Sequence, residues 1–485
     1  MNRRDTLRLG AGTVTAALAG CSAVENVLDG GSGSALDGGP GSTGWSTFRG
    51  DPARSGVRPA SAGPGESLSV AWEVTGRDLV EEFHDVGNPE DLTVSAEVSW
   101  PVLADGLAAW TVAYRGLAMD GAADEVPPTV RVVAVDPEDG SVAWAVEPPV
   151  PPGTASAWFA PEADGDHLYV PASVNDGLGL AVYDPATGEE QDRLDLGLPL
   201  LSGQPLVADG TVYVRESGRE GATLRAFDAS DGTERWAVGA SRPESGWPGV
   251  SVADGAVWTL DRRDGQAFLA RDTADGEVRL RTPLTDLPPS LASNAPVPLA
   301  PPTVVDDGVY AAGGVQGLVR RDLAPLVAAD AEGGERWRSF PPGAEGEAVD
   351  IILGPDADPE TVERLREELG LEDGFGTLYG HPVVLDGLVC AAGIGDAGEE
   401  SSGLFAFDAA EGTLEWTAPL PSTTFAPVAA GDVLYAATGE GVTAVSAGGE
   451  HLDTVSLEEP LVEYSPALGG GRLFVPTLRG VTAVE

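Results

Sequence analysis

The sequence predicts an all-β fold, an eight-bladed β-propeller of four-stranded antiparallel blades closed by an N-terminal strand. Three observations predict it: a unit that recurs along the chain, a second hairpin ahead of each unit, and a last unit that lacks its outer strand. A repeat period near forty residues indicates a solenoid or a propeller. The 65 Gly and 39 Pro residues also favour many turns over long helices.

The recurring unit has the pattern A-x-D-x-x-x-G-x-x-x-W, as in AFDASDGTERW at 226–236. An alternating apolar strand ends at the Asp, a Gly-containing turn reverses the chain, and a second strand starts, so the unit predicts a β-hairpin. The other clear copies lie at 134–144 and 406–416, a copy shortened by one residue lies at 328–337, and weaker copies lie at 182–192, 270–280 and 444–452.

The Trp of the unit has a predicted structural role. A Trp at a fixed offset on the outer strand can pack over the neighbouring blade, with its indole N–H bonded to backbone. This role explains why 11 residues of the chain are Trp. In the weaker copies Asp192, Leu280 and Leu452 replace it. The expected blade-docking residues are Trp72, Trp144, Trp236, Trp337 and Trp416.

A second hairpin precedes each unit and is marked by Pro, a short apolar run, an acidic or Gly turn and another apolar run. Two hairpins per unit give four antiparallel strands, and a radial arrangement leaves only short sheet edges. The last unit has three strands before Glu485, and the segment 67–76 can supply the fourth, with Trp72 at the docking position. The eight copies begin at Pro101, Pro161, Pro205, Pro248, Pro302, Pro382, Pro427 and Pro466.

Three segments depart from the minimal blade. Near 342–378 a helical insertion is predicted, because Asp358 precedes Pro359 at a first helical position and Gly370 provides a stop. The segment 77–92 is expected to be an irregular insertion. The segment 113–129 is expected to be a long loop.

The N-terminal segment 1–20 is interpreted as an export signal, because Arg3 and Arg4 precede a short, weakly apolar run that is too short to span a bilayer. The Arg pair is typical of twin-arginine export. The string LAGC ending at Cys21 is typical of a lipobox and predicts lipid attachment at that residue, the alternative being a core helix with a buried Cys. Residues 21–44 are rich in Gly, Ser and Asp and are expected to form a flexible tether. These features predict a lipid-anchored protein on the outer face of the cell membrane.

The charge of the chain limits its partners. Asp and Glu number 77 against 28 basic residues, all of them Arg, which gives a net charge of −49. Such a chain repels nucleic-acid phosphate and anionic lipid headgroups, so neither is an expected partner of the body of the protein. The acidity favours adaptation to concentrated salt, as in halophilic proteins, over an acidic ligand-binding face.

No catalytic, cofactor-binding or metal-binding residues are predicted. The four histidines, His84, His167, His381 and His451, lack the short spacing of zinc ligands. Cys390 lies in an apolar run and is expected to be a buried structural thiol. The acidic hairpin turns offer weak Ca²⁺ ligands, but their role in chain reversal already explains them.

The repeated unit, together with the leader WSTFRGDPARSGV at 45–57, resembles the pyrroloquinoline-quinone (PQQ) repeat propellers over 45–485. That family includes quinoprotein dehydrogenases and the lipoprotein subunit of the bacterial outer-membrane assembly machinery. The dehydrogenases hold quinone between a Trp floor and a vicinal Cys pair, and this chain has neither adjacent cysteines nor Lys, so quinone is not expected.

The resemblance nearest in kind is to the lipoprotein subunit. It implies a non-catalytic, monomeric surface scaffold whose partner is another exported protein or a surface polymer. The alternative is an exported quinoprotein-like or glycan-acting enzyme with a site in the central channel.

Overall fold

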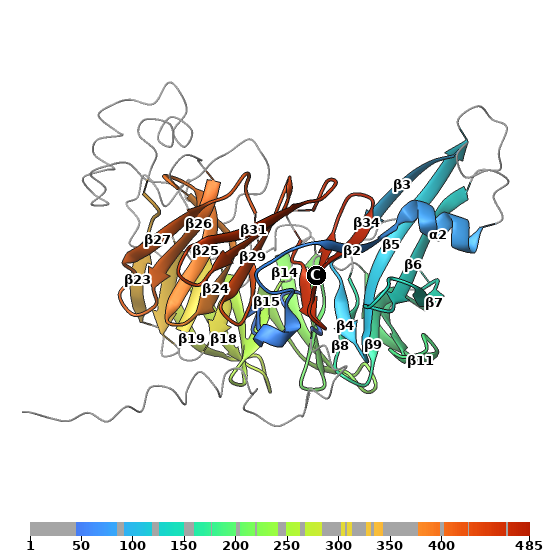
Figure 1. The fold of residues 1–485 in the computed structure, drawn as a ribbon. Coiled ribbons are helices and arrows are strands. Elements are labelled where there is room, and N and C mark those ends of the chain that lie inside the picture. Colours follow the sequence, from blue (N-terminus) through green and yellow to red (C-terminus); the bar gives the residue numbers. More distant parts are fainter. Residues whose placement is uncertain are drawn as a thin grey trace, which may run out of the picture. The chain divides into compact units, whose positions relative to one another are not determined.

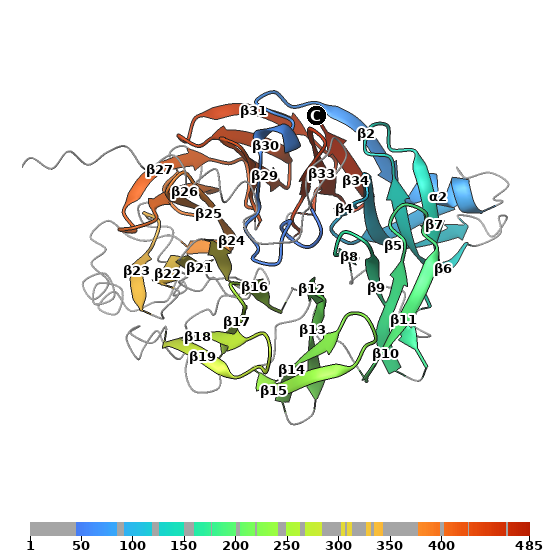
Figure 2. The ribbon, with the colours of Figure 1, turned by 90° about the horizontal axis from the view of Figure 1, so that it is seen from below.

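The fold is a ring of eight β-sheets, the β-propeller that the repeats predict (Figures 1 and 2). In every blade the first strand of the unit lies toward the centre of the ring and the last lies at its rim (Figure 2). The computed structural model describes residues 45–84, 92–118, 126–149, 160–175, 177–199, 204–218, 221–240, 249–261, 267–283, 302–305, 308–312, 326–330, 334–342, 377–397, 402–424, 426–461 and 464–485.

Blades 1 to 4 come from the first half of the chain, and their strands pair antiparallel in chain order. Blade 1 comprises β4 (Val102–Ala104), β5 (Leu107–Ala118), β6 (Val126–Val135) and β7 (Val142–Val146); blade 2 comprises β8 (Glu162–Ala163), β9 (Leu168–Val174), β10 (Gly177–Tyr183) and β11 (Glu190–Leu198); blade 3 comprises β12 (Leu206–Ala208), β13 (Thr211–Gly218), β14 (Gly221–Asp228) and β15 (Glu234–Ala240); and blade 4 comprises β16 (Ser251–Ala253), β17 (Ala256–Asp261), β18 (Ala267–Asp272) and β19 (Val278–Pro283).

Blades 5 to 8 complete the ring in the same way. Blade 5 comprises β20 (Thr303–Val305), β21 (Gly308–Ala312), β22 (Leu326–Asp330) and β23 (Glu335–Ser339); blade 6 comprises β24 (Thr377–Leu385), β25 (Leu388–Ile394), β26 (Ser402–Asp408) and β27 (Leu414–Pro419); blade 7 comprises β28 (Val428–Ala430), β29 (Val433–Thr438), β30 (Gly441–Ser446) and β31 (His451–Ser456); and blade 8 comprises β32 (Ala467–Gly469), β33 (Arg472–Pro476), β34 (Gly480–Val484) and β2 (Val70–Thr75).

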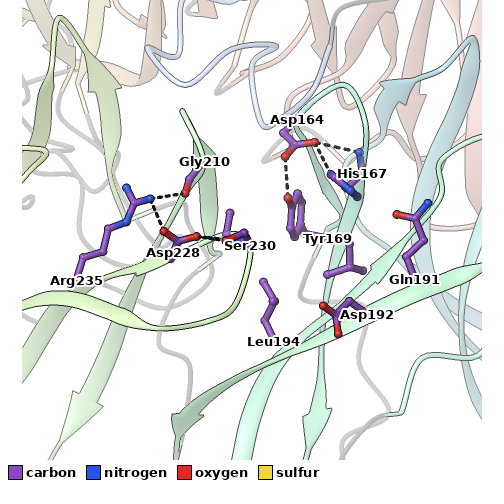
Figure 3. A pocket seen from close by; sticks show the side chains of 12 residues that line it. Asp164, His167, Tyr169, Gln191, Asp192, Leu194, Gly210, Asp228, Ser230 and Arg235 are labelled. Atoms are coloured by element: carbon purple, nitrogen blue, oxygen red, sulfur yellow. Dashed lines mark hydrogen bonds and ion pairs between the residues drawn. The ribbon is translucent and has the colours of Figure 1, made fainter.

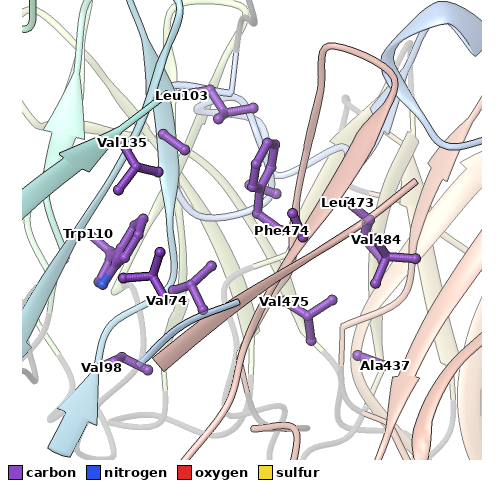
Figure 4. Packing of buried hydrophobic residues seen from close by; sticks show 14 of the residues in the cluster. Val74, Val98, Leu103, Trp110, Val135, Ala437, Leu473, Phe474, Val475 and Val484 are labelled. Atoms are coloured by element: carbon purple, nitrogen blue, oxygen red, sulfur yellow. The ribbon is translucent and has the colours of Figure 1, made fainter. Parts of the chain in front are cut away.

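The closing strand is the one that the sequence predicts. In blade 8, β2 pairs antiparallel with β34, and Trp72 lies opposite Ala483. Two backbone hydrogen bonds between Ser69 and Glu485 extend the pairing. The apolar side chains of this blade join those of blades 1 and 7 in one buried cluster, in which Figure 4 shows Val74, Trp110 and Phe474. An N-terminal strand therefore closes the ring.

The hairpin turns of the repeated unit share one hydrogen-bond pattern. In blade 3 the Gly232 N–H donates to the Asp228 carbonyl oxygen at 2.9 Å, and the Ser230 N–H donates to the Asp228 Oδ1 at 2.9 Å. Gly232 has a φ of +72°, which an L side chain rarely adopts. The Asp and Gly of the sequence pattern therefore have separate local functions, one in capping the turn and one in allowing it. The same carbonyl contact recurs at Asp136, Asp184, Asp272 and Asp408.

Blade 1 carries the main departures from the predicted blade. The segment 77–92 begins with a helix, α2 (Gly76–Phe83), instead of an irregular insertion, because Thr75 and Asp78 form a capping box at its N-terminus. This helix packs against β3 (Leu92–Val98) and β5, and β3 adds a fifth strand to the blade (Figure 1). The long loop expected at 113–129 is also wrong, since β5 and β6 extend the hairpin through most of that segment.

The leader, the insertion before blade 6 and the turn of blade 7 also differ from the minimal blade. The strand β1 (Val57–Arg58) pairs parallel with β28, and the short 3₁₀ helix η1 (Ala60–Ala62) follows it. The helix expected at 358–370 lies outside the described residues, whereas the end of that insertion is already strand β24. In blade 7 the register places Asp453, and not Leu452, opposite Ala444, because the turn is one residue shorter than in blade 3, where Ala226 lies opposite Trp236. Asp453 therefore holds the docking position there.

Candidate functional site

Five tryptophans join consecutive blades. The Trp236 Nε1–H donates to the carbonyl oxygen of Thr273 in blade 4 at 2.9 Å. Its ring lies so close to Gly276 that a Cβ there would come within 2.8 Å of it. Each of the other four rings likewise packs against a turn glycine of the next blade and donates its Nε1–H to a carbonyl oxygen there. The hydrogen bonds, of 2.9–3.0 Å, run from Trp72 to Pro137, from Trp144 to Pro185, from Trp337 to Ala409 and from Trp416 to Ala447.

The junction between blades 2 and 3 is different and contains a cavity of about 420 Å³. Asp192 occupies the Trp position there, opposite Val182 in the strand register. Figure 3 shows side chains of both blades facing one another across this cavity, which we call the Asp192 pocket. It is lined by Asp164, His167, Tyr169, Val182, Gln191, Asp192, Leu194, Gly210, Asp228, Ala229, Ser230 and Arg235.

The blade 2 side of the pocket is built around Asp164. Its Oδ2 accepts a hydrogen bond from the Tyr169 hydroxyl at 2.7 Å, and its Oδ1 lies 3.4 Å from the Nδ1 of His167. Burial and then this carboxylate raise the pKa of Tyr169, so its hydroxyl stays protonated and remains a donor to Asp164. The ring of Tyr169 is 3% exposed and forms part of the pocket floor.

The blade 3 side is built around Asp228, whose Oδ2 lies 2.7 Å from the guanidinium of Arg235. The Ser230 hydroxyl donates to Asp228 Oδ1, and these two contacts lower the pKa of Asp228. Arg235 also donates to the Gly210 carbonyl oxygen at 3.1 Å, which fixes the guanidinium against the turn.

Asp192 itself is exposed, and its Oδ1 accepts a hydrogen bond from the Arg193 N–H at 2.7 Å. Among the described residues its carboxylate has no ion-pair partner. The pocket therefore holds the carboxylates of Asp164, Asp192 and Asp228 against one guanidinium. This excess of negative charge favours a cationic ligand group at the pocket mouth.

The centre of the ring is occupied by the chain's own leader, residues 45–58. Figure 2 shows this blue segment looping among the inner strands. Its carbonyl oxygens accept hydrogen bonds of 2.7–3.0 Å from the first strands of blades 1, 2, 4, 5 and 7. The donors are the backbone N–H groups of Leu103, Ala163, Val252, Val304 and Ala429.

Two buried arginines of the leader extend these contacts. Arg49 donates to the carbonyl oxygen of Pro382, within β24 of blade 6, at 2.8 Å and to that of Pro427, directly before β28 of blade 7, at 2.9 Å. Arg54 donates to the carbonyl oxygen of Phe48 and the hydroxyl of Thr47, both at 2.8 Å. Burial lowers the pKa of Arg49 to about 9 and that of Arg54 to about 10, so both remain charged at neutral pH.

Two further titratable groups are buried at this centre. Burial raises the pKa of Glu162 to about 7, against the opposing attraction of Arg54. Burial and then the charges of Arg49 and Arg54 lower the pKa of His381 well below its usual value, so its imidazole is neutral. Sequence reasoning did not single out Arg49, Arg54 or Glu162, although the buried leader could have been suspected from its Trp45 and Phe48.

The remaining residues singled out in the sequence lie apart from one another. His84 is hydrogen-bonded to the Tyr114 hydroxyl at 3.1 Å, and His451 to Thr454 at 2.9 Å. Cys390 is 1% exposed in β25, and burial raises the pKa of its thiol to about 12. Within the described ranges no three His, Cys, Asp or Glu side chains are grouped as metal ligands. Arg3, Arg4 and Cys21 lie outside the described residues.

In the part of the chain that the structure describes, no helix is long and apolar enough to cross a membrane.

Comparison with known proteins places the chain among propellers. The family model described as outer membrane protein assembly factor BamB matches residues 128–351. No curated protein sequence matches. The crystal structure of BamB from Moraxella catarrhalis is 15% identical, with 86% of this chain and 97% of that chain covered and a TM-score of 0.47.

Two quinohemoprotein alcohol dehydrogenases also match in structure. The enzyme from Pseudomonas putida HK5 is 15% identical, with a TM-score of 0.53, and that from Comamonas testosteroni is 14% identical, with a TM-score of 0.51. Each alignment covers 92% of this chain and 80% of the enzyme. In its repeat and in its fold, the chain resembles the PQQ-repeat β-propellers.

Proposed function

We propose that this protein is a non-catalytic scaffold, exported through the Arg3–Arg4 signal and held on the outer face of the cell membrane by a lipid on Cys21, that binds another exported protein or a surface polymer. The observation that carries the proposal is the filled centre of the ring. Residues 45–58 occupy the axial position and bond to the inner strands of five blades.

A substrate or cofactor in the channel would have to displace this leader. Displacement would break the hydrogen bonds of Arg49 to Pro382 and Pro427. The Pro382 carbonyl oxygen would keep the Thr303 hydroxyl as a donor, whereas the buried Pro427 carbonyl oxygen would lose its Arg49 donor, at a cost of about 1–3 kcal/mol. The sequence also lacks the adjacent cysteines and the Lys that a quinone site of the dehydrogenase kind uses. Both points favour a scaffold over a quinoprotein-like or glycan-acting enzyme with a site in the channel.

The partner is expected to bind outside the channel. A net charge of −49 disfavours nucleic acid and anionic lipid, and it favours a partner with exposed cationic groups. The description of the matching family model, an outer membrane protein assembly factor, is consistent with a role in binding other envelope proteins. Because the ring closes on itself, we expect the protein to act as a monomeric propeller.

Affinity capture at native salt tests the proposal. The protein is captured from intact cells after brief chemical cross-linking, and the Cys21→Ser variant captured from the medium is the matched control. We expect one exported protein or polymer to be enriched with the anchored form, and purified partner to bind the Cys21→Ser form directly. Cys21→Ser should release the protein to the medium, and continued membrane retention would contradict the proposed anchor.

An activity assay distinguishes a scaffold from an enzyme. The purified chain is mixed with PQQ and Ca²⁺ and assayed with an artificial electron acceptor over a panel of alcohols and sugars. We expect no turnover and no quinone binding by equilibrium dialysis. Stoichiometric quinone binding with substrate-dependent dye reduction would replace the scaffold with the enzyme.

A further inference from the structure

The Asp192 pocket lies at a junction where the strand position that carries a docking Trp in five other blades carries Asp192. In blade 3 the row across the strands is Tyr213, Ala226 and Trp236, and in blade 2 it is Tyr169, Val182 and Asp192. The two blades therefore present the same register up to the last position. At that position blade 2 has a short carboxylate where blade 3 has a Trp.

At the junctions that contain a docking Trp, the contacts of its ring show which groups such a junction can bind. The ring of Trp236 lies 6.0 Å from that of Tyr213, and the ring of Trp337 lies 6.2 Å from that of Tyr310, in both cases tilted. Each indole N–H bonds to the carbonyl of the residue that follows the Asp of the next hairpin turn. In the Asp192 pocket the residue that follows Asp228 is Ala229, which lines the cavity.

The walls of the pocket are suited to an aromatic ring. Tyr169, Val182, Leu194 and Ala229 are 2–8% exposed and present apolar surface to it. Leu194 and the backbone of Asp195 cover Gly232, the glycine on which a docking Trp would otherwise rest. The open volume therefore lies over the first half of the hairpin turn, between Tyr169 and Ala229. A volume of about 420 Å³ falls within the ~300–1,000 Å³ typical of small-ligand sites.

We propose that the Asp192 pocket binds the indole ring of a tryptophan from a partner polypeptide, with a Lys or Arg next to that tryptophan pairing with Asp192. The ring lies beside Tyr169 over the first half of the hairpin turn, displaced from the position of a docking Trp because Leu194 covers Gly232, and its N–H donates to the Ala229 carbonyl oxygen. The flanking cation is selected because Asp164, Asp192 and Asp228 surround the mouth with one guanidinium between them. This proposal rests on the scaffold function and assigns it a contact site.

The test uses the peptide Lys-Trp-Lys with 5-fluorotryptophan, titrated into the purified full chain and followed by ¹⁹F NMR at the lowest salt at which circular dichroism shows the native fold. Lys-Ala-Lys, labelled on its acetyl group with fluorine, measures the attraction of any cationic peptide to an acidic surface. We expect Lys-Ala-Lys to bind at least about tenfold more weakly, because it lacks an aromatic ring to bury. Equal affinities would overturn the proposal.

Variants locate the site. Asp192→Trp supplies an internal ring, and we expect it to weaken Lys-Trp-Lys binding at least about tenfold. Asp192→Asn keeps the pocket open and removes one charge, and we expect about threefold weaker binding of Lys-Trp-Lys, typical of one exposed ion pair, with unchanged binding of N-acetyl-tryptophanamide. The matched control is Glu189→Gln, which removes an exposed carboxylate of the same blade outside the pocket. Its affinity should equal that of the wild type.

The outcomes distinguish this proposal from the scaffold function. Unchanged Lys-Trp-Lys affinity in a folded Asp192→Trp would show that the indole binds elsewhere, and would overturn the pocket assignment. Unchanged affinity in Asp192→Asn would overturn the pairing of the cation with Asp192. N-acetyl-tryptophanamide binding as tightly as Lys-Trp-Lys would overturn the flanking cation. If the partner recovered by surface capture still binds Asp192→Trp at full affinity, the scaffold stands and its contact site lies outside this pocket.

Discussion

The contact between Trp236 and Gly276 offers a quantitative test of how the blades are joined. Trp236 is 7% exposed, and its replacement by Ala should lower the free energy of unfolding by about 4 kcal/mol, through lost burial and the cavity left behind. Gly276 has a φ of +73°, and a Cβ there would lie 2.8 Å from the Trp236 ring. Gly276→Ala should therefore cost about 3 kcal/mol, from a strained backbone and from overpacking.

The two effects should not add. Without the ring, the Ala at 276 no longer meets Trp236, and the backbone strain remains together with a close contact of 3.1 Å to the Cγ1 of Val238. The double variant should therefore lose about 5 kcal/mol instead of about 7 kcal/mol, which is a coupling of about 2 kcal/mol. Urea unfolding at native salt, followed by far-ultraviolet circular dichroism, measures all four forms.

The matched control is Gly387→Ala in blade 6. Gly387 has a similar φ of +75°, but a Cβ there would meet no atom within 4 Å. Combined with Trp236→Ala, this substitution should be additive within about 0.5 kcal/mol. If the Gly276 pair were equally additive, the ring would not be packed on that glycine, and the account of blade docking would be refuted.

Three further predictions concern the buried groups. Burial raises the pKa of Glu162 from 4.5 to about 7, so between these pH values the folded state retains a proton that the unfolded chain has released. The contribution of this protonated group to the free energy of unfolding is therefore fully present below pH 4.5 and is lost as the pH rises through 7. Glu162→Gln should therefore gain about 3 kcal/mol relative to the wild type between pH 4.5 and 8 in urea titrations, and parallel profiles would contradict the raised pKa. Arg49→Lys should lower the free energy of unfolding by about 3 kcal/mol, because an ammonium group cannot make the two-pronged hydrogen bonds of the guanidinium. The control Arg193→Lys changes an exposed ion pair and should alter the free energy of unfolding by less than about 0.5 kcal/mol. Equal effects of the two substitutions would exclude a role for the guanidinium geometry of Arg49. In a Cys21→Ser background, Cys390 should resist iodoacetamide in the native state and react in urea, as mass spectrometry can measure, because its thiol is buried and its pKa is about 12; rapid native alkylation would show that β25 opens.

The sequence was sufficient for the architecture because the fold is a sum of local units. Each hairpin is specified by residues within eleven positions, and Asp228 and Gly232 act in the structure as their turn chemistry requires. Closure by β2 was also predictable, since the last unit has one strand fewer than the others. This prediction is confirmed by the pairing of Trp72 with Ala483.

The errors arose where neighbours in space override the local pattern. The helix α2 was missed because its capping box, Thr75 and Asp78, follows directly on the closing strand, and its buried face is defined by β3 and β5. In blade 7 the turn is one residue shorter than in blade 3, so the docking position falls on Asp453 and not on Leu452. Asp453 instead accepts a hydrogen bond from the Leu68 N–H. A pattern match along one chain segment cannot detect such a shift in register.

The Asp192 pocket could be predicted from the sequence only in part. The replacement of Trp by Asp192 was visible in the sequence, but a missing ring alone predicts only a weaker junction. The cavity depends on how Leu194 closes over Gly232 and on where the blade 3 turn leaves Ala229, and both are contacts between blades. The buried arginines were less predictable still, because Arg49 and its acceptor Pro427 are 378 positions apart.

These long separations bear on the order in which the propeller folds. Residues 45–75 supply both the centre of the ring and the outer strand of blade 8, and they bond to segments as distant as Ala429 and Val484. The ring is therefore completed only when blades 7 and 8 are available to the leader and to β2, and such distant contacts form late because they close the largest loops. We therefore expect the centre and the last strand to form together at the end of folding, which agrees with export in the folded state, the route predicted from Arg3 and Arg4.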